Sequence, residues 1–160
     1  TDLTINAAQA ATIATTLNAG TDVTVQTAAA GAQPGNITVA ASIAKSSGGA
    51  ATLQLQAHNN IVFNTGVQVS SSSNALNVTL NADLDASNAG AILMNLNSAV
   101  LANGGDIVLG GGADRLRGRG AAVRATSAAM PSTPTCRRGS TASRSAPPNA
   151  AAAGAPRRRR

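Results

Sequence analysis

The stretch Gly104-Gly105-Asp106-Ile107-Val108-Leu109-Gly110-Gly111-Gly112 shows how this chain is built. Glycine marks a turn because it adopts positive φ at little cost, a polar residue follows, and three β-formers then lead back to glycine. Looser versions of this unit, a polar or small entry residue followed by alternating apolar and polar residues, recur upstream at residues 2–5, 22–25, 36–39, 51–55, 60–63 and 77–80. Each unit is typical of a short β-strand.

Composition divides the chain into two unlike parts. Residues 1–113 hold five Asp and a single Lys, whereas residues 114–160 hold all eleven Arg and one Asp, so an acidic body precedes a strongly basic tail. The chain has no Trp or Tyr, and Phe63 is its only aromatic residue. Large aromatic side chains supply much of the buried area of compact globules. A core of Ile, Val, Leu and Ala suits a repetitive architecture better.

The connections between the strands read as turns. The strand units follow one another at short, irregular intervals, without the helical crossovers of α/β folds. In the segment 6–19 alanine favours a helix, but β-branched Thr12, Ile13, Thr15 and Thr16 disfavour it, so we expect no helix and keep one as the alternative. We predict an all-β fold over residues 1–113: a parallel β-helix whose coils of ~20 residues each pass through two or three short strands.

Polar residues beside the strands carry a further expectation. Identical side chains at turns can form hydrogen-bonded ladders from coil to coil, as they do in cross-β stacks. Lys45 adjoins the turn at residues 46–49, where we expect its charge to stay solvated. The body holds thirteen Asn, and we expect the ladder role for those next to strands: Asn36, Asn60, Asn64, Asn77 and Asn81.

The ordered series of these units resembles a known family. Residues 18–25, 35–39, 51–61, 76–83 and 104–112 are similar to the repeat region of filamentous-haemagglutinin-like exoproteins. This resemblance implies a right-handed parallel β-helix, the stalk of a large bacterial surface adhesin exported by a partner transporter of the outer membrane. The amino-terminal secretion domain of that family, with its Asn-Pro motifs, has no counterpart here. The resemblance therefore implies an interior fragment of a stalk.

Residues that could carry chemistry are few. Cys136 is the only Cys and His58 the only His, so a metal cluster or a Ser-His-Asp triad would rest on His58 alone, and we expect a turn or ladder role for it. Asp83 and Asp85 lie two residues apart and could form the carboxylate pair of a polysaccharide-active β-helix enzyme. Because no basic residue lies nearby, we interpret them as solvated loop carboxylates. We assign no catalytic, cofactor-binding or metal-binding residues.

The segment Gly110-Gly111-Gly112-Ala113-Asp114 resembles one calcium-binding nonapeptide of secreted toxins. That motif needs tandem copies, so that consecutive turns supply the ~6–8 oxygen ligands of each ion. Only one imperfect copy is present, next to Arg115 and Arg117. We therefore expect no calcium binding.

The tail, residues 114–160, has a different amino-acid composition. It holds five of the six Pro and few large aliphatic residues, and it ends in four Arg. Such a segment cannot bury enough apolar surface to offset the entropy of ordering its backbone, so we expect a disordered tail. Arginine-rich tails bind nucleic-acid phosphates, which makes non-specific nucleic-acid binding an alternative function. Without aromatic residues to stack on bases, specific recognition is not expected.

The abrupt change near residue 114 suggests that the tail arose by a frameshift. In a GC-rich gene, Gly codons GGC read one nucleotide later give the Ala codon GCG, and read two later give the Arg codon CGG. Translation of the coding DNA downstream of codon 114 in the other two frames should then restore strand units rich in Asn, Gly and Val. If neither frame does so, the tail is a genuine basic segment.

We expect a structural module of a secreted surface adhesin, and not an enzyme. Its expected partners are cell-surface receptors and, for the parent protein, the outer-membrane transporter, with no specific nucleic acid. No apolar run approaches the ~18–20 residues of a membrane span, so we expect no transmembrane segment. The sequence opens without a basic region followed by an apolar one, so we expect the export signal to lie outside this piece.

Overall fold

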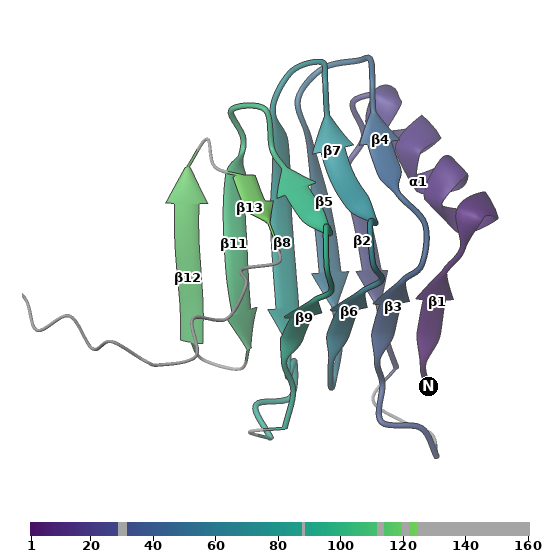
Figure 1. Ribbon diagram of the computed structural model, residues 1–160, viewed down its shortest axis with the longest axis vertical. Coiled ribbons are helices and arrows are strands. Elements are labelled where there is room, and N and C mark those ends of the chain that lie inside the picture. Colours follow the sequence, from purple (N-terminus) through teal and green to yellow (C-terminus); the bar gives the residue numbers. More distant parts are fainter. Residues whose placement is uncertain (29–31, 88, 112–113, 120–121, 125–160) are drawn as a thin grey trace, which may run out of the picture. The chain divides into compact units, whose positions relative to one another are not determined.

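The computed structural model describes residues 1–28, 32–87, 89–111, 114–119 and 122–124. These residues belong to one compact unit, Thr1–Ala128. Within it the chain is mostly strands in three sheets, with one helix (Figure 1). The rest of the tail lies outside the described residues, and so do the predictions made for it.

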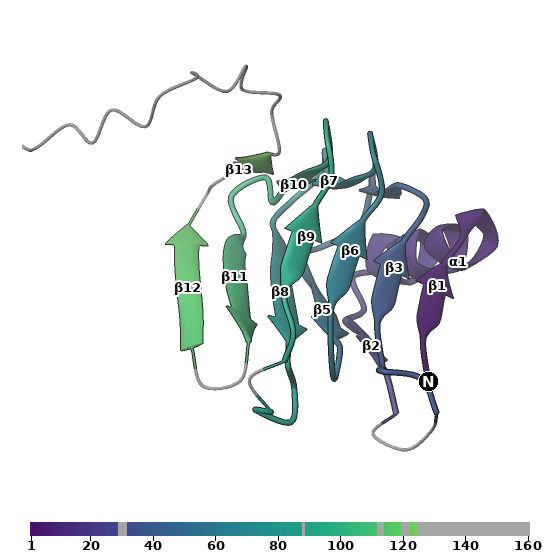
Figure 2. The same ribbon diagram turned by 60° about the horizontal axis from the view of Figure 1, so that its bottom comes forward.

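Each sheet contains strands that are distant in sequence. Sheet A consists of β1 (Leu3–Ile5), β3 (Ile37–Val39), β6 (Ile61–Phe63) and β9 (Ile92–Met94). Sheet C consists of β4 (Ile43–Lys45), β7 (Gln68–Ser71), β10 (Ala99–Leu101) and β13 (Ala122–Arg124). Sheet B consists of β2 (Val23–Gln26), β5 (Ala51–Gln56), β8 (Leu76–Ala82), β11 (Asp106–Gly111) and β12 (Asp114–Arg119). Figure 2 shows the strands of sheets A and B side by side in these orders.

From β3 onward the chain visits sheets A, C and B in turn, and we call each such passage a layer. The layers are β3, β4 and β5; β6, β7 and β8; and β9, β10 and β11. All pairings between these layers are parallel, so the predicted parallel strands are confirmed. In sheet A, Ile37 pairs with Leu3 on one side and with Ile61 on the other. The intervals along the chain are 34 residues from Leu3 to Ile37 (37 − 3) and 24 residues from Ile37 to Ile61 (61 − 37), and both exceed the expected coil of ~20 residues. The first interval is the longer because it contains a helix.

The helix corrects the expectation for residues 6–19. Helix α1 (Ala7–Asn18) follows β1 and precedes β2, so the first layer has a helix where later layers have a strand of sheet C. Asn6 and Gln9 form a capping box: Asn6 Oδ1 accepts from Gln9 N at 3.1 Å, and Gln9 Oε1 accepts from Asn6 N at 2.9 Å. Ala10, Ile13 and Leu17 form the buried stripe. The cap and this stripe outweigh the weak helix propensity of threonine.

The inward residues of successive layers form aliphatic columns. Paired strands place Leu53 against Val78 and Leu55 against Leu80, and all four side chains are buried. Phe63 is buried in the same way at the centre of sheet A. Residues on the same face of paired strands lie about 5 Å apart, which lets small aliphatic side chains exclude water without large aromatics.

A second set of contacts joins each layer to the next at the entry to a strand. In sheet A, Asn36 N donates to Asp2 Oδ1 (2.8 Å), Asn60 N to Asn36 Oδ1 (3.0 Å) and Ala91 N to Asn60 Oδ1 (2.8 Å). Sheets B and C repeat the arrangement: Thr52 N donates to Asp22 Oδ1 at 2.7 Å, Asp106 N to Asn77 Oδ1 at 2.9 Å and Gln68 N to Ser42 Oγ at 3.0 Å. We call these contacts the entry ladder.

The entry ladder confirms part of the prediction for asparagine. Asn36, Asn60 and Asn77 do connect layers, but through side-chain oxygens that accept from backbone N–H groups of the next layer. Asn64 is exposed, and buried Asn81 has an Oδ1 atom without a hydrogen-bond partner among the described residues. The hydrogen bonds to Asn36 and Gly35 N–H groups lower the pKa of Asp2, with the Asn36 backbone bond contributing most.

Two strands lie beyond residue 113, where the sequence analysis placed the end of the strand pattern. β12 pairs antiparallel with β11, and β13 pairs antiparallel with β10. Gly111 is opposite Asp114 and Leu109 is opposite Leu116, so sheet B continues into the basic segment.

Substitution of Asn60 tests the entry ladder. Asn60→Ala removes the acceptor of Ala91 N–H and should lower the free energy of unfolding by about 0.5–1.5 kcal/mol, the usual net value of one hydrogen bond. The control is Asn64→Ala, which changes an exposed side chain directly after the end of β6 and should change the free energy of unfolding by less than about 0.5 kcal/mol. Urea denaturation measures both. Equal effects would show that the ladder does not stabilise the stack.

Candidate functional site

His58 lies in the short connection between β5 and β6, half-buried against Thr27 of the preceding layer. Thr27 Oγ1 is 3.2 Å from Gly35 O, 3.0 Å from His58 N and 3.0 Å from His58 Nδ1. A hydroxyl has one proton and two lone pairs. If Thr27 Oγ1 donates its proton to Gly35 O, its two lone pairs accept from the backbone N–H of His58 and from a protonated His58 Nδ1. The hydroxyl proton and both lone pairs are then used. This geometry holds a connection in place and leaves Nδ1 engaged.

Gly35 completes this arrangement. Its φ is +84°, and a Cβ atom there would lie 3.0 Å from His58 Cβ and 3.3 Å from Thr27 Oγ1. Positive φ and close approach both require glycine.

Asp83 and Asp85 differ in burial. Asp83 is buried, with φ +54°, and its Oδ1 atom accepts from Ser87 N at 2.7 Å and Ser87 Oγ at 2.8 Å. Asp85 is exposed. The interpretation of both as solvated loop carboxylates is therefore wrong for Asp83, which closes a turn within the β8–β9 connection.

Of the glycine-rich segment, Gly110, Gly111 and Asp114 are described, and all three belong to strands of sheet B. Gly110 and Gly111 belong to β11 and pair with Asn81 and Ala82 of β8. Across the described ranges, no group of three or more His, Cys, Asp or Glu residues could hold a metal ion.

Lys45 is a second polar residue that sequence reasoning placed wrongly. Its side chain is only 1% exposed, and Nζ donates to the carbonyl oxygens of Ser47 (2.7 Å), Ser73 (2.8 Å) and Gly48 (3.3 Å). The three ammonium protons therefore have three acceptors, from turns of two layers. The alternation Ile43-Ala44-Lys45 contained the signal, since it puts Lys45 on the inward face with Ile43.

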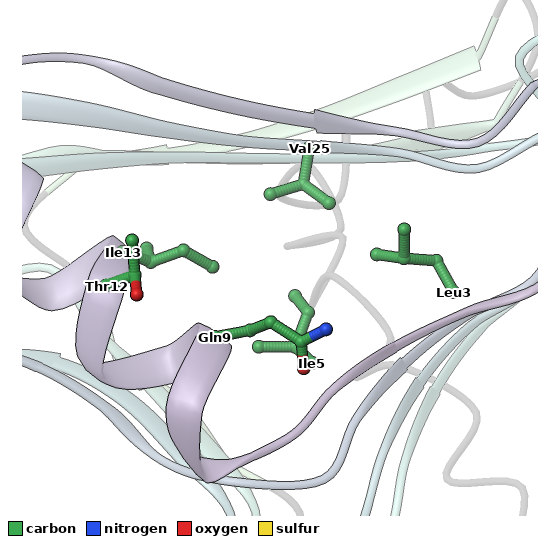
Figure 3. A pocket seen from close by; sticks show the side chains of 6 residues that line it. All are labelled: Leu3, Ile5, Gln9, Thr12, Ile13 and Val25. Atoms are coloured by element: carbon green, nitrogen blue, oxygen red, sulfur yellow. The ribbon is translucent and has the colours of Figure 1, made fainter.

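An apolar pocket lies in the first layer between β1, α1 and β2. It has a volume of about 280 Å³ and is lined by Leu3, Ile5, Gln9, Thr12, Ile13 and Val25 (Figure 3). Figure 3 shows Val25 on one side of the space and Ile5, Ile13 and Leu3 around the others. Sequence reasoning missed this pocket because it assigned no helix here. Two polar atoms of its lining are already engaged: Gln9 Oε1 caps α1, and Thr12 Oγ1 donates to Ala8 O at 3.1 Å.

These features are contacts between layers and one apolar pocket. Over the described part of the chain, the residues proposed from sequence do not converge on one reactive centre, and the pocket is apolar. No helix among the described residues has the length and hydropathy needed to cross a membrane. Comparisons with protein-family models, curated proteins and solved structures gave no match.

Lys45 offers a test of this structural interpretation. Lys45→Met keeps most of the buried volume but removes three hydrogen bonds to carbonyl oxygens, and should lower the free energy of unfolding by about 1.5–3 kcal/mol. The control Ala44→Met adds the same side chain on the exposed face of β4 and should have little effect. Thermal and urea unfolding measure both variants. A Lys45→Met protein as stable as the original would show that the carbonyl cage contributes nothing.

Proposed function

We propose that this chain is a piece of the stalk of a large bacterial surface adhesin of the filamentous-haemagglutinin type. In this proposal the layers are coils of a right-handed parallel β-helix, and the parent protein is exported by an outer-membrane partner. The repeated parallel register, joined by the entry ladder, is the observation that carries the proposal. A unit that repeats along one direction can build a long shaft from short segments.

Two physical arguments support the finer parts of the proposal. Connections between parallel strands of one sheet are right-handed in about 98% of cases, which favours a right-handed coil. Several polar side chains also form hydrogen bonds between layers. They are those of Asp2, Asn36, Asn60 and Lys45. Side chains used in this way hold a shaft together.

Receptor contacts are made by the connections between strands, because the side chains of the strands are used in the aliphatic columns and in the entry ladder. The β8–β9 connection spans residues 83–91, whereas the equivalent β5–β6 connection spans only residues 57–60. Longer loops on a rigid scaffold are the usual place for binding residues. The extra residues of 83–91 are thus the candidate contact region, with Asp85 and Ala86 exposed there.

Surface labelling tests the proposed function. Antibodies raised against the purified chain should label intact cells of the bacterium that encodes it, without lysis, and should detect the parent protein in the culture medium. Deletion of the gene should abolish labelling and reduce adhesion to host cells or to other bacteria. An antibody against a periplasmic protein is the control for cell integrity. Labelling that appears only after lysis would refute a surface adhesin.

A further inference from the structure

In the first layer, which consists of β1, α1 and β2, the edges of the three sheets are covered to different extents. Helix α1 lies against β4, and Asn18 Oδ1 accepts from Ser46 N (2.8 Å) and Ser47 N (3.1 Å) just beyond that strand (Figure 1). The edge of sheet C is therefore covered by a helix, which is one way in which proteins protect sheet edges.

The edge of sheet A is capped by two glutamines. Leu3 N donates to Asn36 O of β3, so the alternation of a strand directs the N–H groups of Asp2 and Asn6 to the free side. Gln33 Oε1 accepts from Asp2 N and Gln9 Oε1 from Asn6 N, both at 2.9 Å. Thr4 alone keeps its edge-directed backbone groups without such a cap among the described residues.

The edge of sheet B has no such cover among the described residues. Thr27 N donates to Gln56 O of β5 at 3.0 Å, so Val23, Val25 and Thr27 direct their backbone groups to β5. The backbone groups of Asp22, Thr24 and Gln26 consequently point away from the sheet. The inward side chains of Val23 and Val25 are half-buried, whereas their partners Leu53 and Leu55 are fully buried. Val25 also forms one wall of the 280 Å³ pocket.

We propose that two copies of this chain associate through their β2 strands, which pair antiparallel about a two-fold axis at Thr24. Thr24 then lies opposite Thr24 of the second copy, and Asp22 lies opposite Gln26 of the second copy. All of these residues direct their backbone groups to the free edge, so each opposed pair exchanges two hydrogen bonds. Val23 faces Val25 of the second copy in the closer, non-hydrogen-bonded pairs.

Several features of β2 favour a second copy as the occupant. Val23-Thr24-Val25 reads the same in both directions, so the two-fold axis places valine against valine on the inward face, next to the pocket. The strand itself carries no charge, and the two Asp22 residues lie at opposite ends of the paired strands. The opposite edge of sheet B already carries an antiparallel strand, β12 on β11. The proposal concerns the 160-residue chain by itself. In the proposed stalk, a preceding coil of the parent protein would pair with the same edge of β2, so that pairing and the dimer exclude each other.

Proline at residue 24 tests the pairing. Thr24→Pro removes an N–H group that makes no bond within the sheet, so the fold should be kept while the edge is blocked. The matched control, Thr24→Val, keeps the N–H group and a β-branched side chain. In sedimentation velocity on the full chain, the original protein and Thr24→Val should give twice the 15.6 kDa mass of one copy at tens of micromolar. Thr24→Pro should dimerise at least tenfold more weakly.

A disulfide provides a second measurement that does not rely on proline. Directly opposed residues of a hydrogen-bonded antiparallel pair have Cα atoms about 5.5 Å apart, which suits a disulfide. In a Cys136→Ser background, Thr24→Cys should give a covalent dimer on mild oxidation, whereas Thr38→Cys, in the middle of sheet A, should not. A monomeric original protein would overturn the proposal. So would a dimer that survives Thr24→Pro and fails to cross-link preferentially at residue 24.

Discussion

The entry ladder is the interaction on which the rest of the structure depends. Small aliphatic side chains are similar in shape, so their packing alone specifies the register between paired strands weakly. A slip of one residue would exchange the inward and outward faces of a strand. The ladder opposes that slip, because a side-chain oxygen at the entry to a strand accepts from the backbone N–H group of the equivalent residue in the next layer, as at Asp22, Asn60 and Asn77. Asn60 shows both roles: its N–H group donates to Asn36, and its Oδ1 atom accepts from Ala91.

Features that follow from local alternation could be predicted from the sequence. The strands of residues 37–39, 51–56 and 76–82 follow from alternating β-formers. Their parallel pairing was expected from the spacing of the strand units together with the absence of helical crossovers. Asparagine before a strand indicated contacts between layers. Its acceptor role could not be read from sequence, because the donor is a backbone group that only the register places.

The misplaced features depend on tertiary contacts. Helix α1 owes its stability to a capping box and to burial of Ile13 and Leu17 against the first strands, which outweigh threonine's weak helix propensity. Lys45 is buried because turns of two layers converge on Nζ with three carbonyl oxygens, although a lone lysine near a Gly-rich turn is usually solvated. Asp83 is buried because Ser87 folds back onto it. No pattern in the sequence indicated the apolar pocket.

The parallel stacking of layers is tested most directly by solution NMR of the full chain. Parallel pairing predicts backbone contacts between Ile37 and Ile61 and between Leu53 and Val78, which are pairs from successive layers. It also predicts slow hydrogen exchange for Asn60 N–H, which Asn36 Oδ1 accepts. Antiparallel contacts between strands adjacent in sequence, such as β5 with β6, together with rapid exchange at Asn60, would contradict the stacked arrangement.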